Sequence, residues 1–173
     1  LQKVYEVQGD CDLTAFKSAC SIFGGKIYSI ERGPTYTPLF APNDLNFQAG
    51  ISDYALTLIN APQAWDLTQG NDSVVIAISD QNFEITHQDL EGKYLYYDAT
   101  NTAPTTHGTA VAITAAGKTN NGYGLSSIGF NTSLSLYKMN FNEVLAASYA
   151  GADVINISWT SGCFYSQLEQ DVM

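Results

Sequence analysis

The chain has 173 residues, 45% of them hydrophobic and 14% charged, a composition that excludes disordered, collagen-like and coiled-coil proteins. Seven Lys and Arg residues against 17 Asp and Glu residues give a net charge of -10, so neither nucleic acid nor a membrane is an expected partner. No apolar run reaches the roughly 18 residues that span a bilayer.

Residues 1–42 are expected to form a small α+β segment. Alternating patterns predict short strands over 3–7 and 26–30, and a short helix that begins after Asp12 and ends at Ala19. Glycine and proline over 33–42 break regular structure and predict a linker, with a domain boundary near residue 42.

Three cysteines leave the redox state open. Cys11 and Cys20 are close enough in sequence for a local disulfide, which would leave Cys163 over. Three unpaired thiols are the alternative, and the cysteine count does not decide between the two.

From about residue 60 the pattern alternates between helix and strand. A helix is predicted from Asn60 to Gly70, with Pro62 in its first turn. Further strands are predicted over 74–78, 134–137 and 154–157, and further helices over 107–116 and 142–150. This order predicts an α/β fold, a parallel sheet with helices on both faces. Leu168 and Val172 have helical spacing, and we interpret Met173 as a truncation inside a helix.

Asp80 and His107 are the candidate catalytic residues. Asp80 follows the most apolar predicted strand, and open α/β sheets place their sites at the carboxyl ends of strands. His107 begins a buried helix, where Thr105 or Thr106 would cap the backbone and Gly108 would permit a close approach. A carboxylate that holds an imidazole in one tautomer is the base half of a nucleophilic triad. A capping Asp and an unrelated surface His are the alternative.

The sequence around these two residues resembles the subtilisin-like serine peptidases, the subtilase family. The resemblance is carried by Ile78-Ser79-Asp80-Gln81-Asn82-Phe83, by His87-Gln88-Asp89-Leu90 and by His107-Gly108-Thr109-Ala110-Val111-Ala112. Residues 120–125 and 151–158 continue it, in the family's order. It implies a subtilisin-like fold, with Asp80 and His107 catalytic, a propeptide-like segment over 1–42, and the N-terminal part of a peptidase domain over 43–173.

Several positions depart from the family pattern. Gln81-Asn82 stands where Thr-Gly is usual, which we expect to alter the turn after Asp80. Ala110 replaces a usual His, and Ile113 replaces a usual Gly. Thr160-Ser161 stands where paired glycines often line the primary specificity pocket, so the pocket is expected to differ in shape.

The family nucleophile is a serine in a Gly-Thr-Ser stretch, and the 173 residues contain no such tripeptide. The family's oxyanion-binding Asn was not found either, because Asn156 is expected inside a strand. We expect the nucleophile to be encoded beyond Met173, so that the fragment, with only the Asp and the His, is inactive alone.

The resemblance implies a secreted serine endopeptidase, although no signal peptide is visible at Leu1. Its partners would be a polypeptide substrate and its own propeptide, and it would require no cofactor. The substrate would bind as an added strand to Ser158, Trp159, Thr160, Ser161 and Gly162. Asp89 and Asn121 resemble positions at which some subtilases coordinate a structural calcium ion. A turn Asp and a turn Asn are the alternative there.

Two other functions stay open. One is a non-catalytic subtilase-like interaction module, suggested by the altered residues after Asp80. The other is a metal-dependent hydrolase in which Asp80, His87, Asp89 and His107 gather around zinc.

Overall fold

The computed structural model describes residues 7, 9–10, 12–24, 27, 29–33, 40–44, 54–160 and 166–172. The chain divides into two compact units, Leu1–Thr37 and Pro38–Met173. This division falls a little before the predicted boundary at residue 42, because Pro42 and Asp44 are buried in the second unit. The roles predicted for the two parts stay predictions.

The first unit contains the helix α1 (Leu13–Cys20), followed by a short 3-10 helix, η1 (Ser21–Phe23). Asp12 caps α1 as predicted, since its carboxylate accepts a hydrogen bond from the backbone N–H of Ala15 at 3.3 Å. Most of the two predicted strands lies outside the described residues, and the parts inside, 7, 27 and 29–30, have no regular structure. Cys20 is a free cysteine, whereas Cys11 and Cys163 lie outside the described residues.

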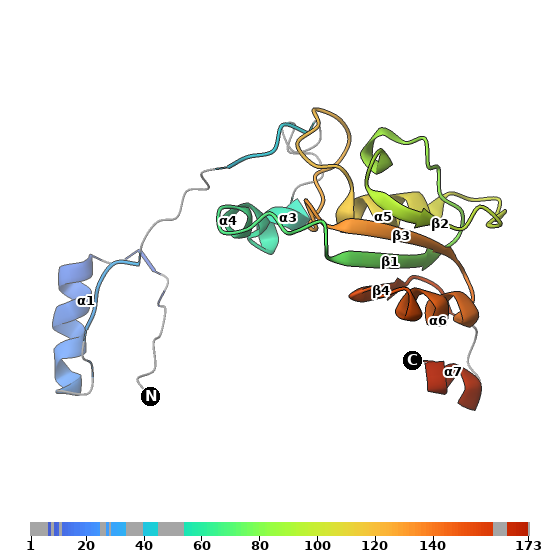
Figure 1. Cartoon of the computed structure of the whole chain (residues 1–173). Helices are drawn as coiled ribbons and strands as arrows, with labels where there is room; N and C mark the ends of the chain where they lie inside the picture. Colours follow the sequence, from blue (N-terminus) through green and yellow to red (C-terminus); the bar gives the residue numbers. More distant parts are fainter. Residues whose placement is uncertain are drawn as a thin grey trace. The chain divides into compact units, whose positions relative to one another are not determined.

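The second unit is built on four parallel strands: β1 (Val75–Asp80), β2 (Tyr94–Tyr97), β3 (Ser133–Lys138) and β4 (Val154–Ile157). Their order in the sheet is β2-β3-β1-β4, which confirms the predicted parallel α/β sheet (Figure 1). Sequence analysis missed β2. It is an edge strand with a bulge between Tyr94 and Tyr96, and Leu95 is 69% exposed, so it lacks a buried apolar pattern.

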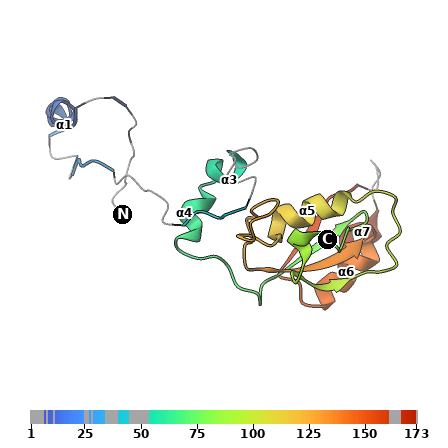
Figure 2. The same ribbon diagram turned by 90° about the horizontal axis from the view of Figure 1, so that it is seen from above.

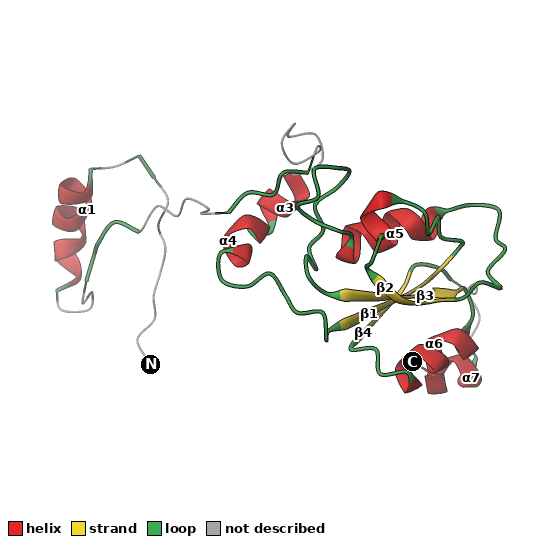
Figure 3. Cartoon of the chain, turned by 45° about the horizontal axis from the view of Figure 1, so that its top comes forward, coloured by secondary structure: helices red, strands yellow, loops and turns green. Residues whose placement is uncertain are grey.

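Helices cover both faces of the sheet. Helix α5 (His107–Ala116) packs on one face and α6 (Phe141–Tyr149) on the other (Figure 3). The bounds of α5 are those predicted. Helix α6 begins just before the predicted start, because the side chain of Asn140 accepts a hydrogen bond from Glu143 N–H at 2.9 Å and caps it. The described part of the C-terminal segment contains α7 (Gln167–Val172).

The helix predicted from Asn60 to Gly70 begins as expected, with Asn60 as its N-cap residue and Pro62 in its first turn, but it ends at Trp65 rather than near Gly70. The structure has two short helices here, α3 (Tyr54–Leu58) and α4 (Ala61–Trp65), beside the sheet rather than over it (Figures 1 and 2). Asn60 adopts a left-handed φ of 56°, and its carbonyl rather than its side chain accepts the bond from Ala64 N–H. After Trp65 the chain tightens, since the N–H groups of residues 67 and 68 both donate to the Ala64 carbonyl.

The main core fills the space between the sheet and α5. Ile78 of β1 and Leu134 and Leu136 of β3 are fully buried there, with Ala112 of α5. Successive side chains of a strand point to opposite faces, so Asp80 shares the α5 face with Ile78. The strand therefore delivers the Asp80 carboxylate beside the first turn of α5. No helix in the described part of the chain is long and apolar enough to cross a membrane.

Candidate active site

Asp80 and His107 form a hydrogen-bonded pair at the carboxyl end of β1. His107 Nδ1 lies 2.8 Å from Asp80 Oδ1, and the Asp80 side chain is 1% exposed. The same carboxylate oxygen accepts a bond from Gln81 N–H at 2.6 Å. Because Asp80 holds Nδ1, the second ring nitrogen of His107, Nε2, is left to exchange a proton with another group. The pair has the geometry of an oriented general base.

His107 is held by the first turn of α5 and presents a half-exposed side chain, 55% accessible. The predicted side-chain cap by Thr105 or Thr106 is wrong, since Thr106 is the N-cap residue but makes no side-chain cap hydrogen bond. Its carbonyl accepts from Thr109 N–H at 3.0 Å instead. The hydroxyl of Thr109 accepts a bond from Glu84 N–H at 2.8 Å, which ties α5 to the loop after β1.

The close approach expected at Gly108 is confirmed. A Cβ atom on Gly108 would lie 2.7 Å from the carbonyl oxygen of Gln81 and 2.7 Å from Phe83 Cε1. No side chain larger than hydrogen fits without a shift of the backbone. This contact sets the distance between α5 and the turn that follows Asp80. The altered pair at that turn is accommodated, since Asn82 Oδ1 accepts bonds from Phe83 N–H and the Tyr97 hydroxyl.

Sequence analysis missed Asn101, which lies in the loop between β2 and α5 and is 6% exposed. Its side-chain amide donates to the carbonyls of Asp80, at 3.4 Å, and Gln81, at 3.2 Å. A single Asn in a loop gives no sequence signal. Its position at the carboxyl edge of the sheet follows only from β2, which was also missed.

A cluster of charges holds the same loop. Asp98 forms an ion pair with Lys138 at 3.3 Å and accepts two hydrogen bonds from Thr100. Burial acts to raise the pKa of Asp98, but the Thr100 hydrogen bonds and Lys138 outweigh it, and the pKa falls below its ordinary value of 3.8. The hydrogen bond to Asp98 raises the pKa of Lys138 above its ordinary value. Asp98 is therefore ionised at neutral pH and can fix the loop that carries Asn101.

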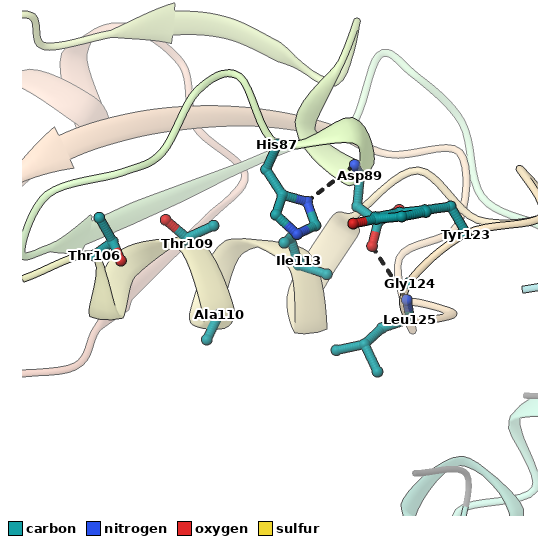
Figure 4. Close-up of a pocket in the computed structure, with 9 residues that line it drawn as sticks. All are labelled: His87, Asp89, Thr106, Thr109, Ala110, Ile113, Tyr123, Gly124 and Leu125. Atoms are coloured by element: carbon teal, nitrogen blue, oxygen red, sulfur yellow. Dashed lines mark hydrogen bonds between the residues drawn. The ribbon is translucent and has the colours of Figure 1, made fainter. Parts of the chain in front are cut away.

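A pocket of about 490 Å³ runs along α5 beyond His107 (Figure 4). His87 Nδ1 accepts a bond from Asp89 N–H at 3.2 Å, and its ring meets Tyr123 edge-on at a centroid distance of 5.8 Å. Ala110 and Ile113, the two departures from the family pattern in this helix, both line the pocket, with Ile113 also in the core. The lining residues are His87, Asp89, Thr106, Thr109, Ala110, Ile113, Tyr123, Gly124 and Leu125.

The structure brings Asp89 and Asn121 together, but not as a calcium site. Asp89 Oδ1 accepts from the Asn121 side-chain amide at 2.9 Å, and Oδ2 accepts from Leu125 N–H at 3.1 Å. Asn121 Oδ1 accepts from Tyr123 N–H at 2.9 Å. Calcium needs six to eight oxygen ligands, roughly, whereas these oxygens face N–H donors. The residues do not fit the predicted ion, and we derive no step through it.

The predicted substrate-binding segment is described only over 158–160, and Ser161 and Gly162 lie outside the described residues. Ser158 and Thr160 are exposed, and the Ser158 hydroxyl accepts a bond from the Asn156 amide at 2.7 Å. Trp159 turns inward, where its indole N–H donates to the Ser79 hydroxyl at 3.0 Å and its ring packs against Phe141. Asn156 lies in β4, as expected.

The four residues considered for zinc do not form one cluster. Asp80 pairs with His107, whereas His87 bonds to the backbone of Asp89 beside the pocket. Within the part of the chain that the structure describes, no group of three or more His, Cys, Asp or Glu side chains could hold a metal ion. The prediction of a shared zinc site is wrong, because the two His side chains take different partners.

The chain is similar to known proteins over most of its length. A family model described as "Subtilase family" matches residues 71–172, more than half of the chain. The chain is 30% identical over 156 residues to a thermophilic serine proteinase of Bacillus sp. strain AK1, a match that covers 79% of this chain and 38% of that protein.

Two further relatives are similar at the same level. Thermitase of Thermoactinomyces vulgaris is 31% identical over 150 residues, which cover 77% of this chain and 53% of thermitase. A halolysin-like extracellular serine protease of Natrialba magadii is 31% identical over 152 residues, which cover 74% of this chain and 28% of that protease. The chain thus spans between about a quarter and a half of the length of these relatives.

Among solved structures, the chain is similar to the prenylagaramide maturation protease PagA, with a TM-score of 0.55 and 17% sequence identity. The match covers 65% of this chain and 45% of that one. At this identity it supports the fold alone.

Proposed function

Because the chain belongs to the subtilase family, we propose that it is part of a serine endopeptidase whose general base is His107, oriented by Asp80. The observation that carries this proposal is the 2.8 Å bond between His107 Nδ1 and the buried Asp80 carboxylate. A carboxylate in this position stabilises the imidazolium that forms when Nε2 takes a proton.

The proposed reaction is hydrolysis of a peptide bond through an acyl-enzyme. His107 Nε2 takes the proton of a serine hydroxyl while the serine oxygen attacks the carbonyl carbon of the substrate. The imidazolium then gives that proton to the leaving amine, and a water molecule repeats the sequence to release the acid. Asp80 stays ionised throughout and holds His107 in the productive tautomer.

We place the serine nucleophile outside these 173 residues, which contain no Gly-Thr-Ser. The greater length of the serine protease relatives supports this. A His–Asp pair alone activates only water, so the 173-residue chain by itself is expected to be inactive.

The substrate is proposed to be an extended polypeptide that pairs with the segment after β4, where Ser158 and Thr160 are exposed residues. The separate compact unit Leu1–Thr37 supports a propeptide-like role for the N-terminal segment. Secretion is proposed because one relative is named an extracellular protease.

A fluorophosphonate probe, which labels activated serines, tests the proposal on the full-length protein. We expect the wild-type protein to be labelled and to hydrolyse casein, and His107→Gln to lose both. Asp72→Asn, a substitution at an exposed loop residue, is the matched control and should behave as wild type. A folded wild-type protein that is neither labelled nor active would instead favour a non-catalytic interaction module.

A further inference from the structure

We propose that Asn101 is a positioning residue for the Asp80–His107 pair, acting through the backbone of the turn after β1. The inference rests on the proposed function. Asn101 touches neither reacting side chain; its amide donates to the carbonyls of Asp80, at 3.4 Å, and Gln81, at 3.2 Å.

The peptide unit between Asp80 and Gln81 is hydrogen-bonded through both its N–H and its carbonyl. Its N–H donates to Asp80 Oδ1 at 2.6 Å, and its carbonyl accepts from Asn101 at 3.4 Å. A peptide unit is planar, so its C=O and N–H point in fixed, opposite directions. When Asn101 holds the oxygen, it thereby aims the N–H at the carboxylate.

The Asp80 carboxylate depends on this support because only one of its two oxygens is hydrogen-bonded within the described part of the chain. Asp80 Oδ2 is buried and has no hydrogen-bond partner among the described residues. Oδ1 alone carries both the bond from Gln81 N–H and the bond to His107 Nδ1. The direction of Asp80 toward His107 therefore depends on the orientation of one peptide unit.

Asn101 also acts on the His107 side of the pair. Its amide donates to the Gln81 carbonyl, the same oxygen that a Cβ on Gly108 would approach to 2.7 Å. The Gln81 carbonyl oxygen therefore lies directly against the first turn of α5. One side chain sets the position of both the strand end that carries Asp80 and the helix start that carries His107.

Asn101 is itself held in place before any substrate binds. Its backbone N–H donates to the Asp98 carbonyl at 3.0 Å, and its Oδ1 accepts from Ala103 N–H at 3.4 Å. The ion pair of Asp98 with Lys138 fixes the loop to β3. A side chain that is buried and bonded at both ends is suited to hold a neighbouring backbone without moving.

The test uses Asn101→Ala and Asn101→Leu in the full-length protein. Alanine removes the amide donor, and leucine removes it while keeping the volume. Thr102→Ala, at the exposed next residue of the loop, is the control. We expect both Asn101 variants to lower kcat on a peptide substrate about tenfold with KM within about twofold, since a small misplacement of catalytic groups acts on the transition state.

One spectroscopic readout separates positioning from simple destabilisation. The downfield NMR signal of the His107 Nδ1 proton should broaden or disappear in both Asn101 variants and persist in Thr102→Ala.

If the leucine variant keeps the wild-type kcat and the wild-type NMR signal, the positioning role is wrong and Asn101 only fills space. If the wild-type protein hydrolyses no peptide, the proposed function fails. In that case the NMR signal alone decides whether Asn101 positions the pair.

Discussion

Asp98 shows how one ionised carboxylate stabilises the loop beside the candidate site. Its side chain is 7% exposed and is bonded to Thr100 and Lys138. Because its pKa is lowered in the folded protein, the stability it contributes is complete above the unfolded-state pKa and is lost as the pH falls through the lower, folded-state pKa.

Asp98→Asn is therefore expected to lower the free energy of unfolding by about 1.5–3 kcal/mol at pH 7, as for a lost hydrogen bond to a charged group. The difference between variant and wild type should shrink as the pH falls from about 4 and vanish once both states are protonated. Urea unfolding at several pH values measures it. A difference that stays constant down to pH 2 would show that the carboxylate charge plays no part.

At the scale of elements, the loop between α5 and β3 depends on one glycine packed against a carboxylate. Gly124 has a φ of 51°, and a Cβ atom there would overlap Asp89 Oδ2. Gly122 has a φ of 74° but no atom within 4 Å of its Cβ position. Both glycines have a left-handed backbone conformation, but an added side chain would clash with Asp89 only at Gly124.

Gly124→Ala should therefore cost several kcal/mol more than Gly122→Ala, for which about 1–2 kcal/mol is expected from the left-handed conformation alone. Thermal unfolding followed by circular dichroism compares them. Equal melting temperatures for the two variants would contradict the packing of Gly124 on Asp89.

The hydrogen bonds of the same loop allow a prediction about the removal of calcium by a chelator. Since the Asp89 and Asn121 oxygens face N–H donors, we expect EDTA to leave the melting temperature of the protein unchanged and added calcium to raise it by less than about 2 °C. A large rise with calcium that Asp89→Asn abolishes would restore the predicted calcium site.

At the scale of the whole second unit, a buried carboxylate joins segments that are far apart in the sequence. Asp44 is 0% exposed and accepts bonds from the N–H groups of Asn120 and Asn121, both at 2.9 Å, and from the Ser126 hydroxyl at 2.6 Å. Asn43 adds a bond from Gly122 N–H at 2.8 Å. Residues 43–44 thus hold the loop after α5 in place through hydrogen bonds from a distant part of the sequence.

Asp44→Ala leaves three donors without their acceptor. The Ser126 hydroxyl is buried, so its loss of a partner costs about 1–3 kcal/mol, whereas the N–H groups of Asn120 and Asn121 are only partly buried and cost less. We expect a loss of about 2–4 kcal/mol in the free energy of unfolding. Asp72→Ala, at an exposed residue, should change it by less than about 0.5 kcal/mol. Similar urea midpoints for the two variants would contradict the anchoring role of Asp44.

The local sequence was enough to predict those helices and strands whose own residues form a clear hydrophobic pattern. The strands β1 and β4, the helix α5 from His107 to Ala116 and the close approach at Gly108 could all be predicted, because runs of apolar residues and the absence of a side chain are visible in the local sequence. Asp80 and His107 were predicted from their places next to those elements together with the resemblance of the surrounding motifs to the subtilase family, and the structure brings them within 2.8 Å.

Only the tertiary structure decided which polar side chains meet. Three side chains act through partners that are 20 to 82 residues away in the sequence: Asn101, Asp44 and Asp98. No local sequence pattern identifies such a partner. The same holds for Asp89, whose oxygens meet N–H donors rather than a cation because of how the loop folds back. Hydrophobic periodicity is a property of neighbouring residues, whereas a hydrogen-bond network exists only once distant segments have been packed together.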